Sequence, residues 1–161
     1  MVLASGADGA FDASPRGGDP GFIRVLDDAT LLLPDWPGNN RLDTLRNILV
    51  DGRTGLLFLI PGVGETLRVN GIAEVSTDPS LLEQWSSEKR LPKTVLRLSV
   101  REAFFHCPKA LIRSRLWHED AKIDRKSLPT YGEMLKDEVD VPESAEEIQA
   151  MVERDSRERL Y

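Results

Sequence analysis

The stretch from residue 55 to residue 76, GLLFLIPGVGETLRVNGIAEVS, holds two predicted β-strands on either side of a Pro-Gly loop. Gly55–Ile60 is a continuous apolar run of strand length, which is typical of a strand buried in the middle of a sheet. Thr66–Ser76 is the second strand, and Gly71 inside it indicates a β-bulge or a bend. The stretch therefore predicts a fold built on β-strands.

Further short strand candidates lie on both sides of this stretch. Thr94–Glu102 alternates apolar and polar residues, so it is expected to be a half-exposed antiparallel strand. Four more strands are expected upstream, the first two joined as a hairpin: Met1–Ser5, Ala10–Ser14, Phe22–Leu26 and Thr30–Leu33. Strands of this length separated by turns favour a small antiparallel barrel with helices at its ends.

Helical patterns are fewer and shorter. Arg41–Val50 has apolar residues at helical spacing, with Asn40 as the expected N-cap. Another short helix is expected after Pro79, and a third over Lys109–Trp117. Residues 119–142 are polar and contain two prolines, so we expect them to be mostly extended, and residues 145–159 are expected to form a terminal helix after a Ser-x-x-Glu capping box.

Composition excludes several classes of protein. The chain has 161 residues, with 21 Lys and Arg against 27 Asp and Glu, a net charge of −6 that disfavours a nucleic-acid-binding protein. One cysteine and two histidines exclude an intrachain disulfide and a site of several Cys or His ligands, so no metal site is expected. No apolar run approaches the roughly 20 residues that span a bilayer. The expectation is a cytoplasmic protein with no membrane role.

No catalytic motif identifies the chemistry. The sequence lacks the GxSxG, Walker A and HExxH patterns. Cys107 follows His106 directly, but neighbours in a strand point to opposite faces, so we interpret Cys107 as an ordinary small residue rather than a nucleophile. No catalytic residue is assigned.

Three segments gather basic and amide side chains. Arg16 follows Ser14 into a Gly-rich bend, which is a ligand-binding loop or a plain surface turn. Asn39, Asn40 and Arg41 precede a helix. The free N–H groups at the start of that helix could bind a phosphate, or the segment is an ordinary N-cap.

The third segment is the predicted helix Lys109–Trp117. Lys109, Arg113 and Trp117 recur every four residues, which suits an anionic planar ligand or an exposed face. Arg68, in the strand at Thr66–Ser76, is a further candidate for binding a ligand. Its side chain either faces a cleft or lies on a solvated face of the strand.

Four strings of this chain resemble the pyridoxamine 5′-phosphate oxidase-like flavoproteins, and specifically a bacterial subgroup of FMN-binding proteins. They are DASPRGGDPGFIRVLDD, LLLPDWPGNNRLDTLRNIL, GLLFLIPGVGETLRVNG and FFHCPKALIRSRLW, which occur in the family's order. The resemblance implies a mainly β fold, the FMN-binding split β-barrel, six-stranded, antiparallel and of Greek-key type, with peripheral helices and a C-terminal helical tail. It also implies a homodimer with two FMN molecules at the interface.

The same resemblance implies a set of cofactor-binding residues. FMN phosphate is expected near Asn39, Asn40, Arg41 and Thr44, with Ser14 and Arg16 where the early strand approaches the flavin. Thr66 and Arg68 match the strand that borders the ring in relatives. Lys109, Arg113 and Trp117 match the subgroup's C-terminal signature and are expected to come from either subunit.

The chain also departs from the true oxidase. The Trp and Arg pattern that holds the pyridoxal substrate is not recognisable, so vitamin B6 oxidation is not expected, and relatives carry an extra helical segment before the first strand. We expect residues 1–118 to form the flavin-binding domain and 119–161 a C-terminal extension. The function implied is an FMN-dependent oxidoreductase of unidentified small-molecule substrate; the alternatives are a non-catalytic flavin binder, a deazaflavin or haem protein, or a structural dimer.

Overall fold

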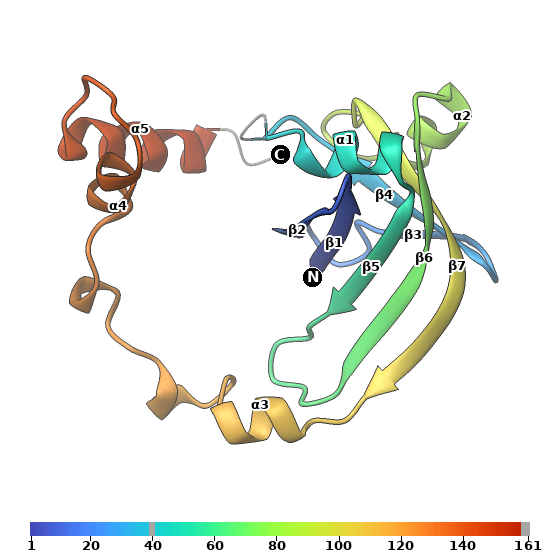
Figure 1. Ribbon diagram of the computed structural model, residues 1–161, viewed down its shortest axis with the longest axis horizontal. Helices are drawn as coiled ribbons and strands as arrows, with labels where there is room; N and C mark the ends of the chain where they lie inside the picture. Colours follow the sequence, from blue (N-terminus) through green and yellow to red (C-terminus); the bar gives the residue numbers. More distant parts are fainter. Residues whose placement is uncertain (39–40, 159–161) are drawn as a thin grey trace. The chain divides into compact units, whose positions relative to one another are not determined.

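Seven antiparallel strands form one sheet within residues 1–38 and 41–158, the part of the chain that the computed structural model describes (Figure 1). The strand order is β2-β1-β5-β6-β7-β4-β3. The strands are β1 (Val2–Ala7), β2 (Ala10–Pro15), β3 (Arg24–Asp27), β4 (Thr30–Asp35), β5 (Arg53–Phe58), β6 (Thr66–Ser76) and β7 (Thr94–His106). The predicted mainly β, antiparallel fold class is confirmed. The seven strands correspond to the seven segments that the sequence pattern predicted, one more than the six that the family resemblance implied.

The helices are short and lie between or after the strands. They are α1 (Asp43–Val50), α2 (Pro79–Leu82), α3 (Lys109–Ser114), α4 (Tyr131–Glu138) and α5 (Ala145–Glu158), with 3-10 turns at Glu83–Trp85, Glu119–Ala121 and Arg125–Ser127. None of the helices in the described ranges is long and apolar enough to cross a membrane.

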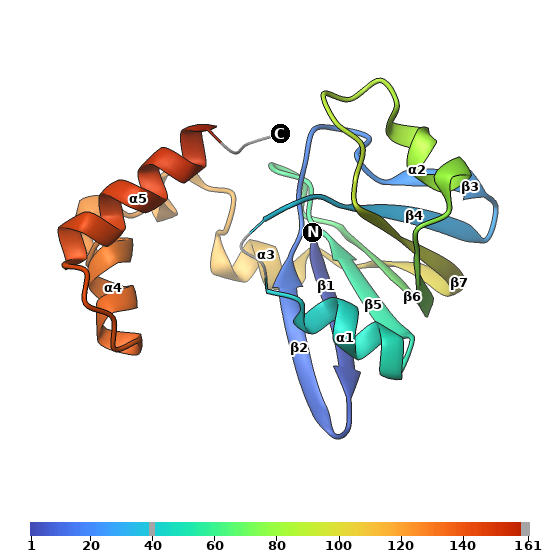
Figure 2. The same cartoon turned by 90° about the horizontal axis from the view of Figure 1, so that it is seen from above.

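The main hydrophobic core lies on one face of the sheet, beneath α1. Every second residue of the central strands points into it, because successive side chains of a strand face opposite sides. Its buried members are Leu3, Leu33, Ile48, Leu56, Val69, Ala73, Leu96 and Leu98. Helix α1 contacts β1, β2 and β6, and Figure 2 shows it beside the β1–β2 hairpin. A smaller core on Leu32 and Val95 encloses Trp85, which is fully buried.

A β-bulge curves the long β6–β7 pair, as Gly71 predicted. Asn70 pairs with Glu102 but Gly71 pairs with Val100, which leaves Arg101 as the extra residue. A Cβ atom on Gly71 would lie 2.2 Å from the carbonyl oxygen of Ser99, so only glycine fits there. The extra residue increases the local twist and lets the two strands bend away from the rest of the sheet.

Two predicted helices differ in their limits. Helix α1 begins at Asp43 instead of Arg41, and its N-cap is Leu42, whose side chain makes no capping hydrogen bond. The predicted capping residue Asn40 lies outside the described residues. Helix α3 ends at Ser114 because Arg115 adopts a left-handed conformation, with φ of 54°.

The chain divides into two compact units, Met1–Trp117 and a second that begins at His118. In the second unit α4 packs against α5. The two helices are so close at Gly132 that a Cβ atom added there would lie 2.0 Å from the carbonyl oxygen of Ala145. The expectation of extended chain over residues 119–142 is wrong at α4. A capping box of Thr130 and Glu133 starts this helix, and its signal outweighs the polar composition.

Candidate functional site

A contact between Arg16 and Thr44 joins the end of β2 to the first turn of α1. The Arg16 guanidinium donates from Nη2 to the Thr44 hydroxyl at 3.2 Å. Thr44 in turn donates to a carboxylate oxygen of Asp12 at 3.5 Å. The backbone N–H of Arg16 donates to the carbonyl of Met1 at 2.9 Å, which extends the β1–β2 pairing by one residue and fixes where Arg16 leaves the sheet.

Asp35 and Thr94 lie at the same end of the main core. They are register partners on β4 and β7. Asp35 lies two positions after Leu33 and Thr94 two positions before Leu96, so both side chains point to the core face. Burial raises the pKa of the half-buried Asp35 carboxyl, and the charges of Arg16 and Lys93 oppose that shift. The buried hydroxyl oxygen of Thr94 has no hydrogen-bond partner among the described residues.

These five residues, Asp12, Arg16, Asp35, Thr44 and Thr94, are called the Arg16 cluster below. The Arg16 guanidinium is a suitable donor for a phosphate monoester, whereas the Thr44 hydroxyl is buried and already donates to Asp12. The first-turn N–H groups of α1 add to the guanidinium, since no side chain caps that helix end. The Thr94 hydroxyl is buried as well as unpartnered, so it is not counted among the groups that meet a ligand. The residues present therefore fit a phosphorylated ligand.

Other predicted cofactor-binding residues surround this cluster in the sequence. Ser14 is half-buried in β2 and pairs with Leu3. Arg41 is exposed and interacts with other residues of the chain. Asn39 and Asn40 lie outside the described residues. Arg16 and Thr44 are two of the residues that the family pattern indicated, and the structure brings them into contact.

Thr66 and Arg68 lie on β6 at the same end of the strands as Arg16. The pairing runs across the sheet from Pro15 to Val2, Leu57, Arg68 and Phe104. Three strand spacings separate β2 from β6, which is about 14 Å. Thr66 is buried, whereas Arg68 is exposed with its guanidinium carbon 5.1 Å from the centre of the Phe104 ring.

The predicted row of Lys109, Arg113 and Trp117 on one helix is wrong. Lys109 and Arg113 are exposed on α3, but the helix ends at Ser114 and Trp117 lies beyond it. The Trp117 indole N–H donates to the carbonyl of Val63 at 2.8 Å, which ties the segment after α3 to the β5–β6 loop. The left-handed Arg115 breaks the helical periodicity on which the prediction depended.

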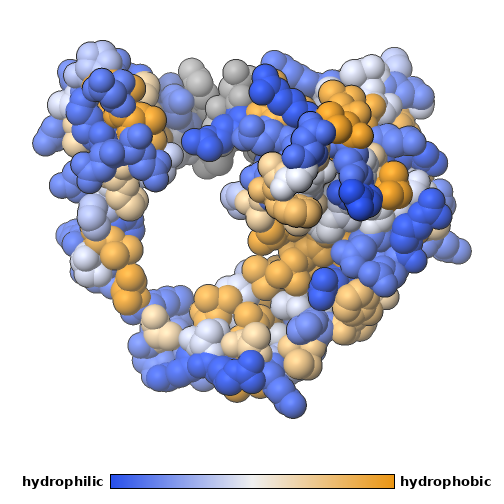
Figure 3. Space-filling view, viewed as in Figure 1, coloured by the Kyte–Doolittle hydropathy of each residue, from blue (hydrophilic) through white to orange (hydrophobic). Residues whose placement is uncertain are grey.

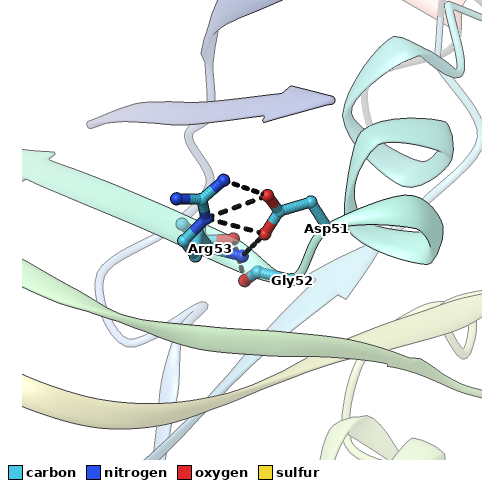
Figure 4. Close-up of polar contacts among 4 residues, drawn as sticks. Asp51, Gly52 and Arg53 are labelled. Atoms are coloured by element: carbon cyan, nitrogen blue, oxygen red, sulfur yellow. Dashed lines mark hydrogen bonds and ion pairs between the residues drawn. The ribbon is translucent and has the colours of Figure 1, made fainter. Parts of the chain in front are cut away.

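A hollow of about 660 Å³ lies at the opposite end of the strands and contains none of the predicted residues. The β1–β2 hairpin forms one side, and Asn70, Arg101 and Glu102 form the other. Asp51 and Arg53 at its rim form an ion pair, which lowers the pKa of Asp51 (Figure 4). Asn70 donates to Glu102 at 2.6 Å. Among its charged groups, Asp51 and Arg53 are thus paired with each other and Glu102 is bonded to a neutral amide.

Sequence reasoning did not select three members of the cluster. Asp12, Ser14 and Arg16 are spaced two residues apart, so their side chains share one face of the strand. This spacing could have marked Asp12 as a neighbour of Arg16. Asp35 and Thr94 are separated by 59 positions in the numbering, and only the β4–β7 pairing brings them together. No local pattern marks either of them.

Comparison with known proteins gives a family and a fold. Residues 1–107 match the profile of the family described as pyridoxamine 5′-phosphate oxidase. A solved HupZ variant of Group A Streptococcus is similar at 21% identity and a TM-score of 0.54, over 65% of this chain and 87% of that one.

Two further solved structures are similar over comparable lengths. A candidate pyridoxamine 5′-phosphate oxidase from Lactobacillus delbrueckii is 23% identical over 64% of this chain and 80% of that one, with a TM-score of 0.47. An FAD-binding protein from Mesorhizobium loti is 18% identical over 63% and 78%, with a TM-score of 0.43. None of the curated proteins compared matches the chain.

Proposed function

The chain belongs to the pyridoxamine 5′-phosphate oxidase family, and from this premise we propose that it is an FMN-binding flavoprotein that acts as an oxidoreductase on a small molecule. The observation that carries the proposal is the Arg16 cluster. It brings the Arg16 guanidinium to the first turn of α1, a helix end that no side chain caps. Those are the groups that recognise a phosphate monoester.

The phosphate of FMN is assigned to Arg16, beside Thr44, with Arg41 and the two asparagines before it as further donors. The flavin ring is assigned to Thr66 and Arg68 of β6, because these residues match the strand that borders the ring in relatives. Arg68 alternates with the core residue Val69, so its side chain points to the face of the sheet opposite that of Arg16, and the two assignments are independent of each other.

A bound flavin supplies the electron and hydride transfer, so the protein needs only to bind, orient and tune it. Arg68 has a role of this kind, because a guanidinium close to the ring favours the reduced, anionic flavin. The Phe104 ring beneath Arg68 restricts where the guanidinium can lie. The absence of a nucleophile or acid–base pair from the sequence pattern is compatible with such a division of roles.

A homodimer is part of the proposal. Large apolar side chains are exposed on the β5–β6 loop, at the end of β7, and on and just after α3, and they are Ile60, Val63, Phe104, Phe105, Ile112 and Leu116. Figure 3 shows apolar residues gathered near that end of the sheet. A monomer rarely leaves a contiguous surface of this kind in water, and a second copy of the chain would cover it.

The test begins with the absorbance spectrum of the purified protein and titration with FMN and riboflavin. Yellow protein, or FMN binding tighter than riboflavin binding, supports the flavin assignment; binding of neither flavin overturns it. NADH and NADPH are then added to the FMN-loaded protein. Reduction faster than that of free FMN supports the oxidoreductase. Reduction no faster, together with a structure in which the flavin N5 is covered, supports a non-catalytic flavin binder.

The walls of the substrate site are tested on the same preparation. Lys109→Ala and Trp117→Ala should slow reduction while FMN stays bound, if the segment around α3 holds the donor. Lys89→Ala is the matched control, because Lys89 is exposed on the loop before β7. Equal rates in all three variants would remove α3 from the site.

A further inference from the structure

The hollow beside the β1–β2 hairpin lies on the face of the sheet that is turned away from the main core. Ala4, Gly55 and Asn70 line it, and they are register partners across β1, β5 and β6. Each of them is next to a core residue of its own strand, so it points to the opposite face. Alanine and glycine leave this face open, and the volume of about 660 Å³ is typical of a small-molecule site.

Phe11 forms an aromatic wall of this hollow. A two-residue turn of Asp8 and Gly9, with φ of 52° and 80°, joins β1 to β2 and sets Phe11 opposite Gly6. A Cβ atom on Gly6 would lie 2.7 Å from Cδ1 of Phe11, so the ring lies directly against the glycine backbone. The rest of the ring is open, since Phe11 is 92% exposed. A flat aromatic group in the hollow would therefore stack on it.

The β-bulge supplies the hollow with a cation. Arg101 is the extra residue of the bulge in β7, and it lines the hollow. Within the part of the chain that the structure describes, its guanidinium has no hydrogen-bond or ion-pair partner. Arg53, the other arginine of the lining, is already paired with Asp51. Bulges commonly redirect a side chain next to a binding site, and here the bulge leaves one guanidinium available to an acid.

Hydrogen-bond acceptors lie next to this cation. Asn70 donates from Nδ2 to Oε1 of Glu102 at 2.6 Å, and no ion pair joins Glu102 to a cation of the described residues. A Cβ atom on Gly55 would lie 3.1 Å from Oδ1 of Asn70, so that amide oxygen lies over the floor of the hollow. Asp8 adds a further carboxylate at the tip of the hairpin. The hollow therefore has acceptors for an ammonium group as well as a donor for an acid.

We propose that this hollow binds a free aromatic amino acid. The aromatic ring stacks on Phe11, the carboxylate bonds to Arg101, and the ammonium group bonds to Glu102 and the amide oxygen of Asn70. An aromatic acid without the amine would be repelled by Glu102, and an amine without the acid would leave Arg101 unpaired, so a ligand with both groups is favoured. The hollow contains no member of the Arg16 cluster, so the inference does not depend on flavin binding.

The experiment titrates the full chain, as purified, with tryptophan and three fragments of it, and calorimetry measures each Kd. Tryptamine lacks the carboxylate, indole-3-propionate lacks the ammonium group, and alanine lacks the ring. Each fragment should bind about tenfold more weakly than tryptophan, as expected when one charged hydrogen bond or one stacked ring is lost. Fragments that bind as tightly as tryptophan, or no binding of tryptophan at millimolar concentration, would overturn the inference.

Two variants then assign the charged groups of the ligand to their partners. Arg101→Gln should remove the preference for tryptophan over tryptamine, and Glu102→Gln should remove the preference for tryptophan over indole-3-propionate. Arg97→Gln is the matched control, because Arg97 lies on the same strand, outside the hollow, and pairs with Glu74. Preferences that stay unchanged in Arg101→Gln and Glu102→Gln would place tryptophan elsewhere on the protein and contradict the inference.

Discussion

The guanidinium of Arg16 lies 3.2 Å from the hydroxyl of Thr44, although 28 residues separate the two in the chain. Between them the chain forms a whole β-hairpin, β3 and β4, before it returns to the sheet at α1. The contact therefore depends on the sheet being assembled. It joins two residues that the family pattern had selected separately, which makes it the best place to test the site.

Arg16→Ala should weaken FMN binding much more than riboflavin binding. A hydrogen bond to a charged group contributes roughly 1.5–3 kcal/mol, which corresponds to about a tenfold to hundredfold rise in Kd. Titration calorimetry or fluorescence quenching measures both ligands. Arg46→Ala, an exposed arginine of α1, is the matched control and should leave both affinities unchanged. An equal loss for FMN and riboflavin would place Arg16 at the ring or in the fold.

Asp35→Asn should stabilise the ligand-free protein at neutral pH. Burial raises the pKa of Asp35 in the folded state, so ionisation is easier in the unfolded chain. Well below the ordinary carboxyl pKa both states are protonated and the residue has no effect. As pH rises through the ordinary and then the raised pKa, the wild type loses stability that the variant keeps.

Thermal unfolding at about pH 2.5, well below the ordinary carboxyl pKa, and at pH 7 checks this. The Tm of Asp35→Asn should exceed that of the wild type only at pH 7. The control Asp28→Asn, whose carboxyl is exposed in the turn before β4, should match the wild type at both. A variant less stable than the wild type at pH 7 would mean that attraction to Arg16 and Lys93 outweighs burial.

Gly71→Ala should destabilise the sheet at its bulge. The new Cβ atom would lie 2.2 Å from a backbone oxygen of Ser99, and backbone cannot move aside as a side chain can. Overpacking of this kind costs about 1–3 kcal/mol. Denaturant unfolding measures the loss, with Gly17→Ala as control, since a Cβ atom there has no neighbour within 4 Å. An unchanged midpoint would mean that the β6–β7 pair shifts register to accommodate the methyl group.

Phe105→Ser should weaken the proposed dimer. The Phe105 side chain is 79% exposed at the end of β7, among the apolar residues assigned to the interface. Phe11 is 92% exposed at the β1–β2 hairpin, which makes Phe11→Ser a matched loss of aromatic surface. Sedimentation velocity over a micromolar concentration series should show more monomer for Phe105→Ser alone. A wild type that sediments as a monomer with FMN bound would refute the dimer.

Glu133 should stabilise helix α4 at neutral pH and lose that effect in acid. Its carboxylate accepts the backbone N–H of Thr130 at 2.6 Å and the Thr130 hydroxyl at 2.8 Å, and these bonds lower its pKa. Because the folded-state pKa is lowered, the stabilisation is complete above the ordinary carboxyl value and disappears as pH falls through the lowered one.

Hydrogen exchange of the peptide over Tyr131–Glu138 measures this. Glu133→Gln should speed exchange at pH 7. Thr130→Ala removes the N-cap, and it should speed exchange by the factor that corresponds to a loss of roughly 1 kcal/mol in helix stability. Glu143→Gln, exposed outside the helix, is the control. No difference between Glu133→Gln and this control would show that the capping box is not formed in solution.

Much of the fold follows from local patterns in the sequence. The apolar run at Gly55–Ile60 predicted a central strand, and β5 lies between β1 and β6. Gly71 predicted a bulge because glycine alone tolerates the close backbone there, and the bulge occurs at that residue. Strand identity and chain breaks are set by side-chain size and backbone freedom over a few residues, so they can be interpreted without the tertiary structure.

The candidate site is different, because its members meet only through pairing between distant strands. Arg16 was recognisable from the family pattern, but neither its contact with Thr44 nor its effect on Asp35 was. Thr94 acquires its unpartnered hydroxyl only once β7 lies against β4. Conversely, the even spacing of Lys109, Arg113 and Trp117 suggested one helical face that does not exist, because Arg115 turns left-handed. Local spacing determines what a segment tends to form, whereas burial and the charges around a side chain arise only when distant strands have paired and packed together.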